Sequence, residues 1–192
     1  MRRWLIALNL VLVVAIVVVA LWRGTVPSPS VAPGGEFTLN GKQGPVALND
    51  FKGKLVLLYF GYTFCPDICP TSLVVWSQAL NALTEAERAR VQPIFVSVDP
   101  ERDTPERLAE YTAFFHPAII GLSGTPERLR EVASRYGAFY ARQENVSAGG
   151  YVIDHTAASF VIDAEGRLVA SIPHATPPDQ FVAMLRQHLP KH

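Results

Sequence analysis

The 192-residue sequence predicts an α/β domain with a mixed central sheet, preceded by one N-terminal transmembrane helix. Three observations support this prediction. Residues 4–22 are almost entirely apolar, strand-like and helix-like patterns alternate after residue 36, and a loop with two cysteines follows the first fully apolar strand. The segment 36–192 has the length of a single compact domain.

Residues 4–22 predict a membrane anchor. Asn9 is the only polar residue in this stretch, and about twenty apolar residues are enough for a helix to cross a bilayer. A cleaved signal peptide is the alternative, because residues 18–20 resemble a small-residue cleavage site. We favour the anchor, because the apolar run is longer than the core of an ordinary signal peptide.

The charges beside this stretch predict the topology. Residues 1–3 include Arg2 and Arg3, whereas only Arg23 follows the span closely. The positive-inside rule leaves residues 1–3 as a short cytoplasmic N-terminus and exports the rest. We therefore expect a single-pass protein of the inner (cytoplasmic) membrane with its domain on the periplasmic side. Residues 23–35 are rich in proline, glycine and serine and predict a semi-extended linker.

Strand signals dominate the first half of the domain. Residues 37–39 and 46–48 flank a glycine-containing turn and predict a short hairpin, and residues 54–60 predict a buried strand. A helix follows this strand, and residues 84–87 fit a capping box for one further turn of helix. Residues 93–98 predict a second buried strand.

The second half predicts two helices, a hairpin and a final helix. Thr104 and Thr125 each precede a proline and a glutamate, which is the pattern of a helix N-terminus. Residues 158–162 and 168–172 surround a turn sequence and predict two antiparallel strands. Residues 177–189 predict a closing amphipathic helix.

The cysteine loop, residues 61–70, is where we place the function. Cys65 and Cys69 each precede a proline, which favours an extended backbone at both. We expect Pro70 to be the first helical residue and Cys69 the N-cap. A thiol there would feel the positive end of the helix dipole, so we expect Cys69 to have the lower pKa. A dithiol at the carboxyl end of the first core strand suggests a thioredoxin-like domain.

Composition narrows the function classes. The chain has 17 basic and 17 acidic residues and no basic run, so binding to nucleic acid has no electrostatic support. Two cysteines are too few for a disulfide scaffold in a domain of this size. They are better explained as a reactive or metal-ligating pair.

Three segments are distinctive: residues 61–71 (GYTFCPDICPT), 97–105 (SVDPERDTP) and 154–156 (DHT). They resemble the signatures of the Sco/SenC family, membrane-tethered copper proteins needed to assemble cytochrome c oxidase. The resemblance extends from residue 37 to residue 189. It implies a thioredoxin-like domain whose copper ligands match Cys65, Cys69 and His155.

The resemblance also implies partners. The usual recipient of the copper is the binuclear copper site of oxidase subunit II, and other copper chaperones or thiol reductants are further candidates. Phe64 stands where many relatives have a polar residue. Because that position varies within the family, we expect Phe64 to affect the partner surface rather than copper binding.

The residue types support copper without the resemblance. Two thiolates select soft ions such as Cu(I) or Zn(II), and no fourth protein ligand for zinc is evident in the sequence. His155 would add a nitrogen ligand that makes Cu(II) acceptable. We expect Asp67, Asp99 and Asp154 to tune these ligands from nearby.

Each of these residues also has a structural explanation. Cys65 and Cys69 could form a disulfide, although a link across so short a loop stabilises little. His155 could simply be a hydrogen-bonded histidine, and Asp99 and Asp103 could be turn or capping groups. The remaining histidines show no metal-binding spacing and are expected on the surface or in loops: His116, His174, His188 and His192.

Whether the protein is also an enzyme is left open by the sequence. The alternative function is a thiol-disulfide oxidoreductase that reduces the cysteines of the oxidase copper site or of another exported partner, with Cys65 and Cys69 as its redox-active pair. A dedicated reductase is expected to have two residues between its cysteines and no need of His155. A peroxidase is a weaker third candidate, because no arginine is evident around the loop.

Overall fold

A computed structural model describes Trp4, residues 34–143 and residues 150–190. The chain divides into two compact units, Met1–Val31 and Ala32–His192, and the second contains the strands and helices of the predicted domain. Most of the predicted N-terminus, anchor and linker lies outside the described residues. No helix in the described part of the chain is long and apolar enough to cross a membrane.

A mixed sheet forms the centre of the domain, as predicted, and it has five strands. Strand β3 is central and pairs in parallel with β4, which pairs in parallel with β5. On its other side β3 pairs antiparallel with β8, and β8 with β9. The strand order is β5 (Ile120–Leu122), β4 (Val91–Ser97), β3 (Leu55–Gly61), β8 (Ala158–Ile162) and β9 (Leu168–Pro173).

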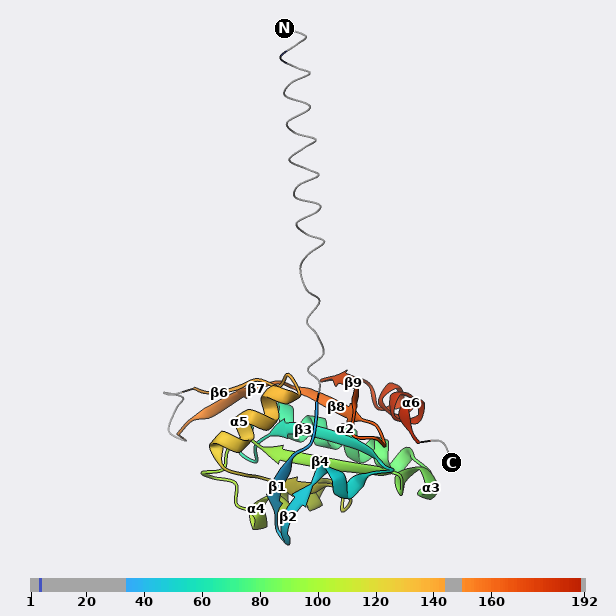
Figure 1. The fold of residues 1–192 in the computed structure, drawn as a ribbon, viewed down its shortest axis with the longest axis horizontal. Coiled ribbons are helices and arrows are strands. Elements are labelled where there is room, and N and C mark those ends of the chain that lie inside the picture. Colours follow the sequence, from blue (N-terminus) through green and yellow to red (C-terminus); the bar gives the residue numbers. More distant parts are fainter. Residues whose placement is uncertain (1–3, 5–33, 144–149, 191–192) are drawn as a thin grey trace. The chain divides into compact units, whose positions relative to one another are not determined.

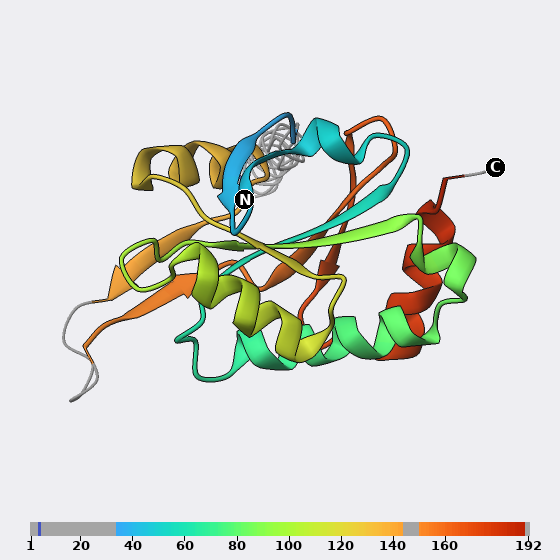
Figure 2. The ribbon, with the colours of Figure 1, turned by 90° about the horizontal axis from the view of Figure 1, so that it is seen from below.

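Helices cover both faces of this sheet (Figures 1 and 2). On one face lie α2 (Ile68–Ala82), α4 (Pro105–Phe115) and α6 (Pro178–His188), and on the other lie α5 (Pro126–Arg135) and the short 3-10 helix η1 (Leu48–Phe51). The one-turn helix α3 (Glu85–Arg88) connects α2 to β4. Since both faces are covered, every residue of β3 is buried, which explains its uninterrupted apolar sequence.

Two small hairpins accompany the central sheet. The first, β1 (Thr38–Gly41) with β2 (Gly44–Ala47), confirms the hairpin predicted near the start of the domain. The second, β6 (Tyr140–Gln143) with β7 (Val152–His155), was not predicted, and neither was β5. Strand β5 has only 3 residues, too few to show the alternation or the apolar run by which a strand is recognised in a sequence.

The predicted helix caps are confirmed. The hydroxyls of Thr104 and Thr125 accept the backbone N–H groups of Arg107 and Arg128, and a proline follows each threonine. Thr84 forms the predicted capping box with Glu87. These side chains satisfy amide groups that have no partner within the helix.

The predicted start of the helix after the cysteines is wrong. Helix α2 begins at Ile68 with Asp67 as its N-cap, so Cys69 and Pro70 lie inside its first turn. The Thr71 N–H donates to the Asp67 carbonyl at 3.2 Å and closes this turn. Pro70 is tolerated there because the first amides of a helix have no intrahelical acceptor. The conformational bias of a residue before proline is therefore overcome at Cys69.

Loss of one helix cap gives a test of this architecture. Replacing Thr125 by alanine removes the oxygen that accepts the Arg128 N–H and should lower the free energy of unfolding by about 1 kcal/mol. Thr125→Ser keeps a hydroxyl at the cap and should stay close to the unmodified protein. Urea unfolding followed by circular dichroism measures both. Equal losses in the two variants would contradict the capping role.

Candidate metal centre

The end of β3 brings the two cysteines into place. Gly61 is the last residue of β3, and its carbonyl accepts the Val98 N–H at 2.8 Å, which extends the pairing with β4. A Cβ atom at Gly61 would lie 2.7 Å from the Cys69 sulfur and 2.8 Å from the Phe95 ring. Only glycine leaves room here for the first turn of α2 to pack this closely against the strand.

The structure brings Cys65, Cys69 and His155 together. Their ligand atoms all lie within 4.8 Å of one another, and the Cys69 sulfur is 3.2 Å from Nε2 of His155. Both cysteines are free thiols. Among the residues that the structure describes, no other cluster of histidine, cysteine and carboxylate groups could hold a metal ion. Two sulfurs and one imidazole nitrogen make a soft donor set.

The surroundings of His155 favour ligation through Nε2. Nδ1 lies 3.3 Å from the Thr156 carbonyl, so a proton on Nδ1 can be donated to that oxygen while Nε2 keeps its lone pair. The rings of Tyr59 and Tyr62 stand edge-on to the imidazole, with centroids 5.9 and 5.8 Å away. A cavity of about 480 Å³ opens beside Cys65 and His155, and its lining also includes Tyr62, Asp67 and Asp154.

The environment of the two thiols separates their pKa values. A hydrogen bond from Cys69 lowers the pKa of Cys65 to about 3, helped by His155 and by the backbone at Asp67 and Cys69, while burial opposes the shift. Burial raises the pKa of Cys69, and the hydrogen bond and charge of Cys65 raise it further. The prediction that Cys69 has the lower pKa is therefore wrong. Cys69 is fully buried within the first turn, whereas Cys65 precedes the helix and is 9% exposed.

Asp103 holds the cysteine loop in place. Its carboxylate is buried and accepts hydrogen bonds from the Thr63 N–H at 3.0 Å, the Thr63 hydroxyl at 2.5 Å and the Ser97 hydroxyl at 2.6 Å. Sequence reasoning treated Asp103 as a turn or capping group. The acidic side chain instead joins the cysteine loop to the end of β4.

Asp99 and Arg102 hold the segment that leads into β7. The Asp99 carboxylate accepts from Nε of Arg102 at 2.5 Å and from the Tyr151 hydroxyl at 2.6 Å. Arg102 also donates to the Tyr151 carbonyl at 3.0 Å. Asp99 thus contacts the segment that precedes β7, four residues before His155.

The other two carboxylates expected near the ligands both belong to residues that line the cavity beside Cys65 and His155. Asp67 is exposed, and its backbone rather than its carboxylate interacts with the Cys65 sulfur. Asp154 lies on the exposed face of β7, where it accepts a hydrogen bond from the Gln143 side chain at 2.6 Å. Neighbouring residues of a strand point to opposite faces, so the Asp154 side chain leaves β7 on the face opposite to that of His155.

Two arginines reach the loop from the segment after β4. The guanidinium groups of Arg102 and Arg107 lie 4.6 and 4.4 Å from the ring centroid of Phe64, which is 45% exposed. The expectation that no arginine lies around the loop is therefore wrong. Both come from a segment that is distant in sequence, and both stack on Phe64 as cation-π pairs.

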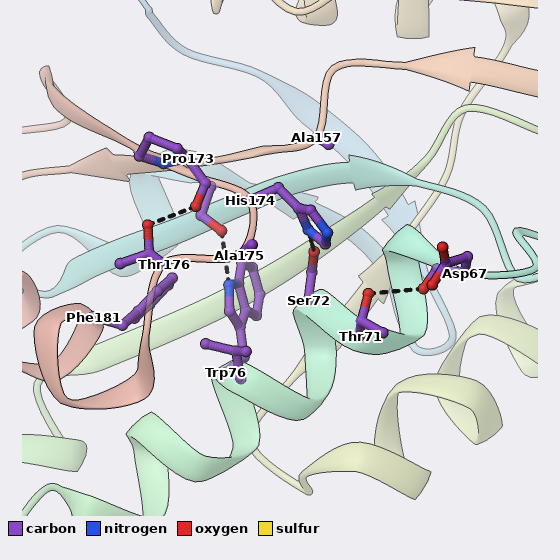
Figure 3. Close-up of a pocket in the computed structure, with 12 residues that line it drawn as sticks. Asp67, Thr71, Ser72, Trp76, Ala157, Pro173, His174, Ala175, Thr176 and Phe181 are labelled. Carbon is purple, nitrogen blue, oxygen red and sulfur yellow. Dashed lines mark hydrogen bonds between the residues drawn. The ribbon is translucent and has the colours of Figure 1, made fainter.

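The remaining histidines in the described part of the chain lie apart from the three-residue group. His116 lies in the loop after α4, as expected, but is buried, and its Nδ1 accepts the Ala118 N–H. His174 is exposed, and its Nδ1 lies 3.0 Å from the Ser72 hydroxyl at a second cavity of about 270 Å³ (Figure 3). This second cavity contains neither cysteine.

Comparison with known proteins identifies relatives over most of the chain. The profile of the family described as SCO1/SenC matches residues 27–190. A relative named "Protein SCO2, mitochondrial" from Saccharomyces cerevisiae is 40% identical over 147 residues, which cover 74% of this chain and 48% of the yeast protein. The chain thus spans about half the length of this relative.

Solved structures resemble the domain closely. The solution structure of apo Sco1 from Thermus thermophilus is 48% identical with a TM-score of 0.75, and the match covers 82% of this chain and 92% of that one. Bradyrhizobium japonicum ScoI, solved with copper bound, is 39% identical with a TM-score of 0.73, and the match covers 81% of this chain and 99% of that one.

The separated thiol pKa values predict selective alkylation. In the reduced, metal-free protein, Cys65 should react with iodoacetamide faster than Cys69, because Cys65 is the thiolate and is closer to solvent. Its rate should change little between pH 8 and about pH 6, whereas the rate of a thiol of ordinary pKa falls about tenfold per unit. Mass spectrometry of digested protein at timed intervals measures both rates. Faster modification of Cys69 would contradict the assignment.

The close approach at Gly61 predicts a steric effect. Gly61→Ala should lower the free energy of unfolding by about 1–3 kcal/mol, because the new methyl group overlaps the Cys69 sulfur and the Phe95 ring. In a Cys69→Ala background the same change should cost less, because the sulfur is gone. Urea unfolding of the four proteins gives the coupling free energy. Strictly additive losses would show that the sulfur does not limit this position.

Proposed function

Because the chain belongs to the SCO1/SenC family, we propose that it is a membrane-tethered copper metallochaperone whose cargo is held by Cys65, Cys69 and His155. The observation that carries this proposal is the convergence of the three ligand atoms within 4.8 Å. The copper bound in the Bradyrhizobium japonicum relative supports the choice of metal.

The donor set suits copper in both oxidation states. Two thiolates are sufficient for Cu(I), whereas Cu(II) prefers a set that includes nitrogen. The cavity beside the ligands leaves room for an incoming group. A recipient can therefore add its own ligand to the ion before the donor ligands leave, which lowers the barrier to transfer.

The recipient we propose is the binuclear copper site of cytochrome c oxidase subunit II. Delivery to an exported site requires the domain on the same side of the membrane, which agrees with the topology expected from Arg2 and Arg3. We therefore propose that the apolar segment 4–22 tethers the domain on the periplasmic side.

The asymmetry of the thiols favours a second candidate, a thiol-disulfide oxidoreductase. The Cys65 thiolate can attack a partner disulfide to form a mixed disulfide and release one partner thiolate. Cys69 then gives its proton to the released partner thiolate and attacks the Cys65 sulfur, which breaks the mixed disulfide and leaves a Cys65–Cys69 disulfide and a partner with two reduced cysteines. The two electrons come from the dithiol of this chain, which is reduced in the structure.

His155 separates the two functions. For a chaperone, His155→Ala should weaken Cu(II) binding much more than Cu(I) binding, because only Cu(II) depends on the nitrogen ligand. In cells, oxidase activity should fall and should recover at least partly with added copper, since excess metal replaces delivery by mass action. Titration of the purified protein with each ion, and oxidase assays at limiting and excess copper, measure these effects.

His174→Ala is the matched control, since His174 lies at the second cavity and not at the three-residue group. It should leave both affinities unchanged. Full oxidase activity of the His155→Ala strain at limiting copper, with disulfide reduction retained, would overturn the chaperone and favour the oxidoreductase.

A further inference from the structure

The candidate metal centre combines two pieces of the fold that share no backbone ladder. The cysteines lie in the loop after β3 and in the first turn of α2, whereas His155 lies in β7. Within the described residues, β7 pairs only with β6, in a two-stranded sheet separate from the central one. The short link from His155 to β8, which pairs with β3, and side-chain contacts together set the position of His155 relative to the dithiol.

The Tyr62 hydroxyl makes one of these contacts. Tyr62 precedes Cys65 by three residues, is 1% exposed, and accepts the backbone N–H of Ile153 at 3.1 Å. This hydrogen bond joins the cysteine loop directly to the backbone of β7. It is buried, and a buried N–H without an acceptor is costly.

The pairing pattern of β7 explains why Ile153 is available. The Thr156 N–H donates to the Phe139 carbonyl, toward the β6 side. Successive residues of a strand direct their N–H groups to opposite edges. The Asp154 N–H therefore also points toward β6, and the Ile153 N–H points away from it. The Ile153 amide therefore has no acceptor in the β6–β7 ladder, and the Tyr62 hydroxyl supplies one.

The same alternation connects Ile153 to His155. Side chains two residues apart lie on the same face of a strand, so Ile153 and His155 both point inward, and the Ile153 side chain is indeed buried. Holding the Ile153 backbone fixes both the register and the depth of His155. The Tyr62 ring also stands at 86° to the imidazole, with the centroids 5.8 Å apart.

On the premise of the copper binding proposed above, we propose that Tyr62 is a positioning residue whose hydroxyl holds His155 at the dithiol and so sets the preference of the site for Cu(II) over Cu(I). Cu(I) needs only the two thiolates, which come from one continuous segment and do not depend on β7. Cu(II) needs the nitrogen and therefore depends on the contact between Tyr62 and Ile153.

The central experiment removes one oxygen atom. Tyr62→Phe keeps the ring against His155 and removes the acceptor of the Ile153 N–H. Loss of an outer contact that orients a metal ligand typically costs about 10- to 100-fold in affinity, so we expect that loss for Cu(II) and about twofold or less for Cu(I). The reduction potential of the bound copper should rise by about 59 mV for each tenfold by which the Cu(II) affinity falls relative to the Cu(I) affinity.

Tyr136→Phe is the matched control. It also removes a tyrosine hydroxyl from a buried ring, in this case one that donates to the Gly35 carbonyl at 2.7 Å. Tyr136 does not line the cavity beside the metal ligands. Both affinities and the reduction potential should stay unchanged in this variant.

A double-mutant cycle separates positioning from a general effect on folding. If Tyr62 acts through His155, then Tyr62→Phe should have no further effect on Cu(II) affinity in a His155→Ala background. Equal weakening of both ions by Tyr62→Phe, or the same loss with and without His155, would overturn the inference.

Hydrogen exchange tests the contact without relying on any variant. In the unmodified protein the Ile153 amide should be protected from exchange although it points away from β6. In Tyr62→Phe this amide should exchange faster, whereas the exchange rate of the Asp154 amide should change less. An Ile153 amide that exchanges as fast as an unstructured one in the unmodified protein would overturn the inference by itself.

Failure of the unmodified protein to bind either ion would overturn the proposed function and this inference with it. If His155→Ala weakens Cu(II) binding as predicted, but Tyr62→Phe binds both ions as the unmodified protein does, this inference alone is overturned.

Discussion

The buried carboxylate of Asp103 is the interaction on which the rest of the centre depends. It accepts three hydrogen bonds, two from Thr63 in the cysteine loop and one from Ser97 at the end of β4. A buried carboxylate is tolerated only when its oxygens are satisfied, so this arrangement strongly restricts the path of the loop. With Thr63 fixed, Tyr62 is directed at β7, and the chain passes through Cys65 into the first turn of α2.

Much of the fold follows from local sequence. The uninterrupted apolar residues of β3 identify the central strand, the threonine-proline-glutamate starts identify α4 and α5, and the turn at residues 163–166 identifies the hairpin of β8 and β9. The sequence did not predict strand β7, because two of its four residues are polar and its partner β6 is equally polar. Its stability depends on neighbours such as Arg102 and Tyr62, which local patterns do not reveal.

The candidate site likewise has features that the sequence predicts and features that only the structure reveals. The ligand types and the resemblance of three short segments identify Cys65, Cys69 and His155, because these depend on residue identity. The order of the thiol pKa values could not be predicted, since it depends on which sulfur lies deeper and which one accepts hydrogen bonds. The role of Asp103 was also beyond local reasoning, because its partner Thr63 is 40 residues away in the sequence.

The separate sheet of β6 and β7 has a consequence for how the centre responds to heat. Proteins open in cooperative units, and a two-stranded sheet that shares no ladder with the central sheet in the described residues has fewer backbone hydrogen bonds to lose than the five-stranded one. The cysteines lie where α2 packs closely on the central sheet. We therefore expect warming to detach the imidazole before the sulfurs. At temperatures where the domain is still folded, we expect a site with two ligands in equilibrium with the site of three.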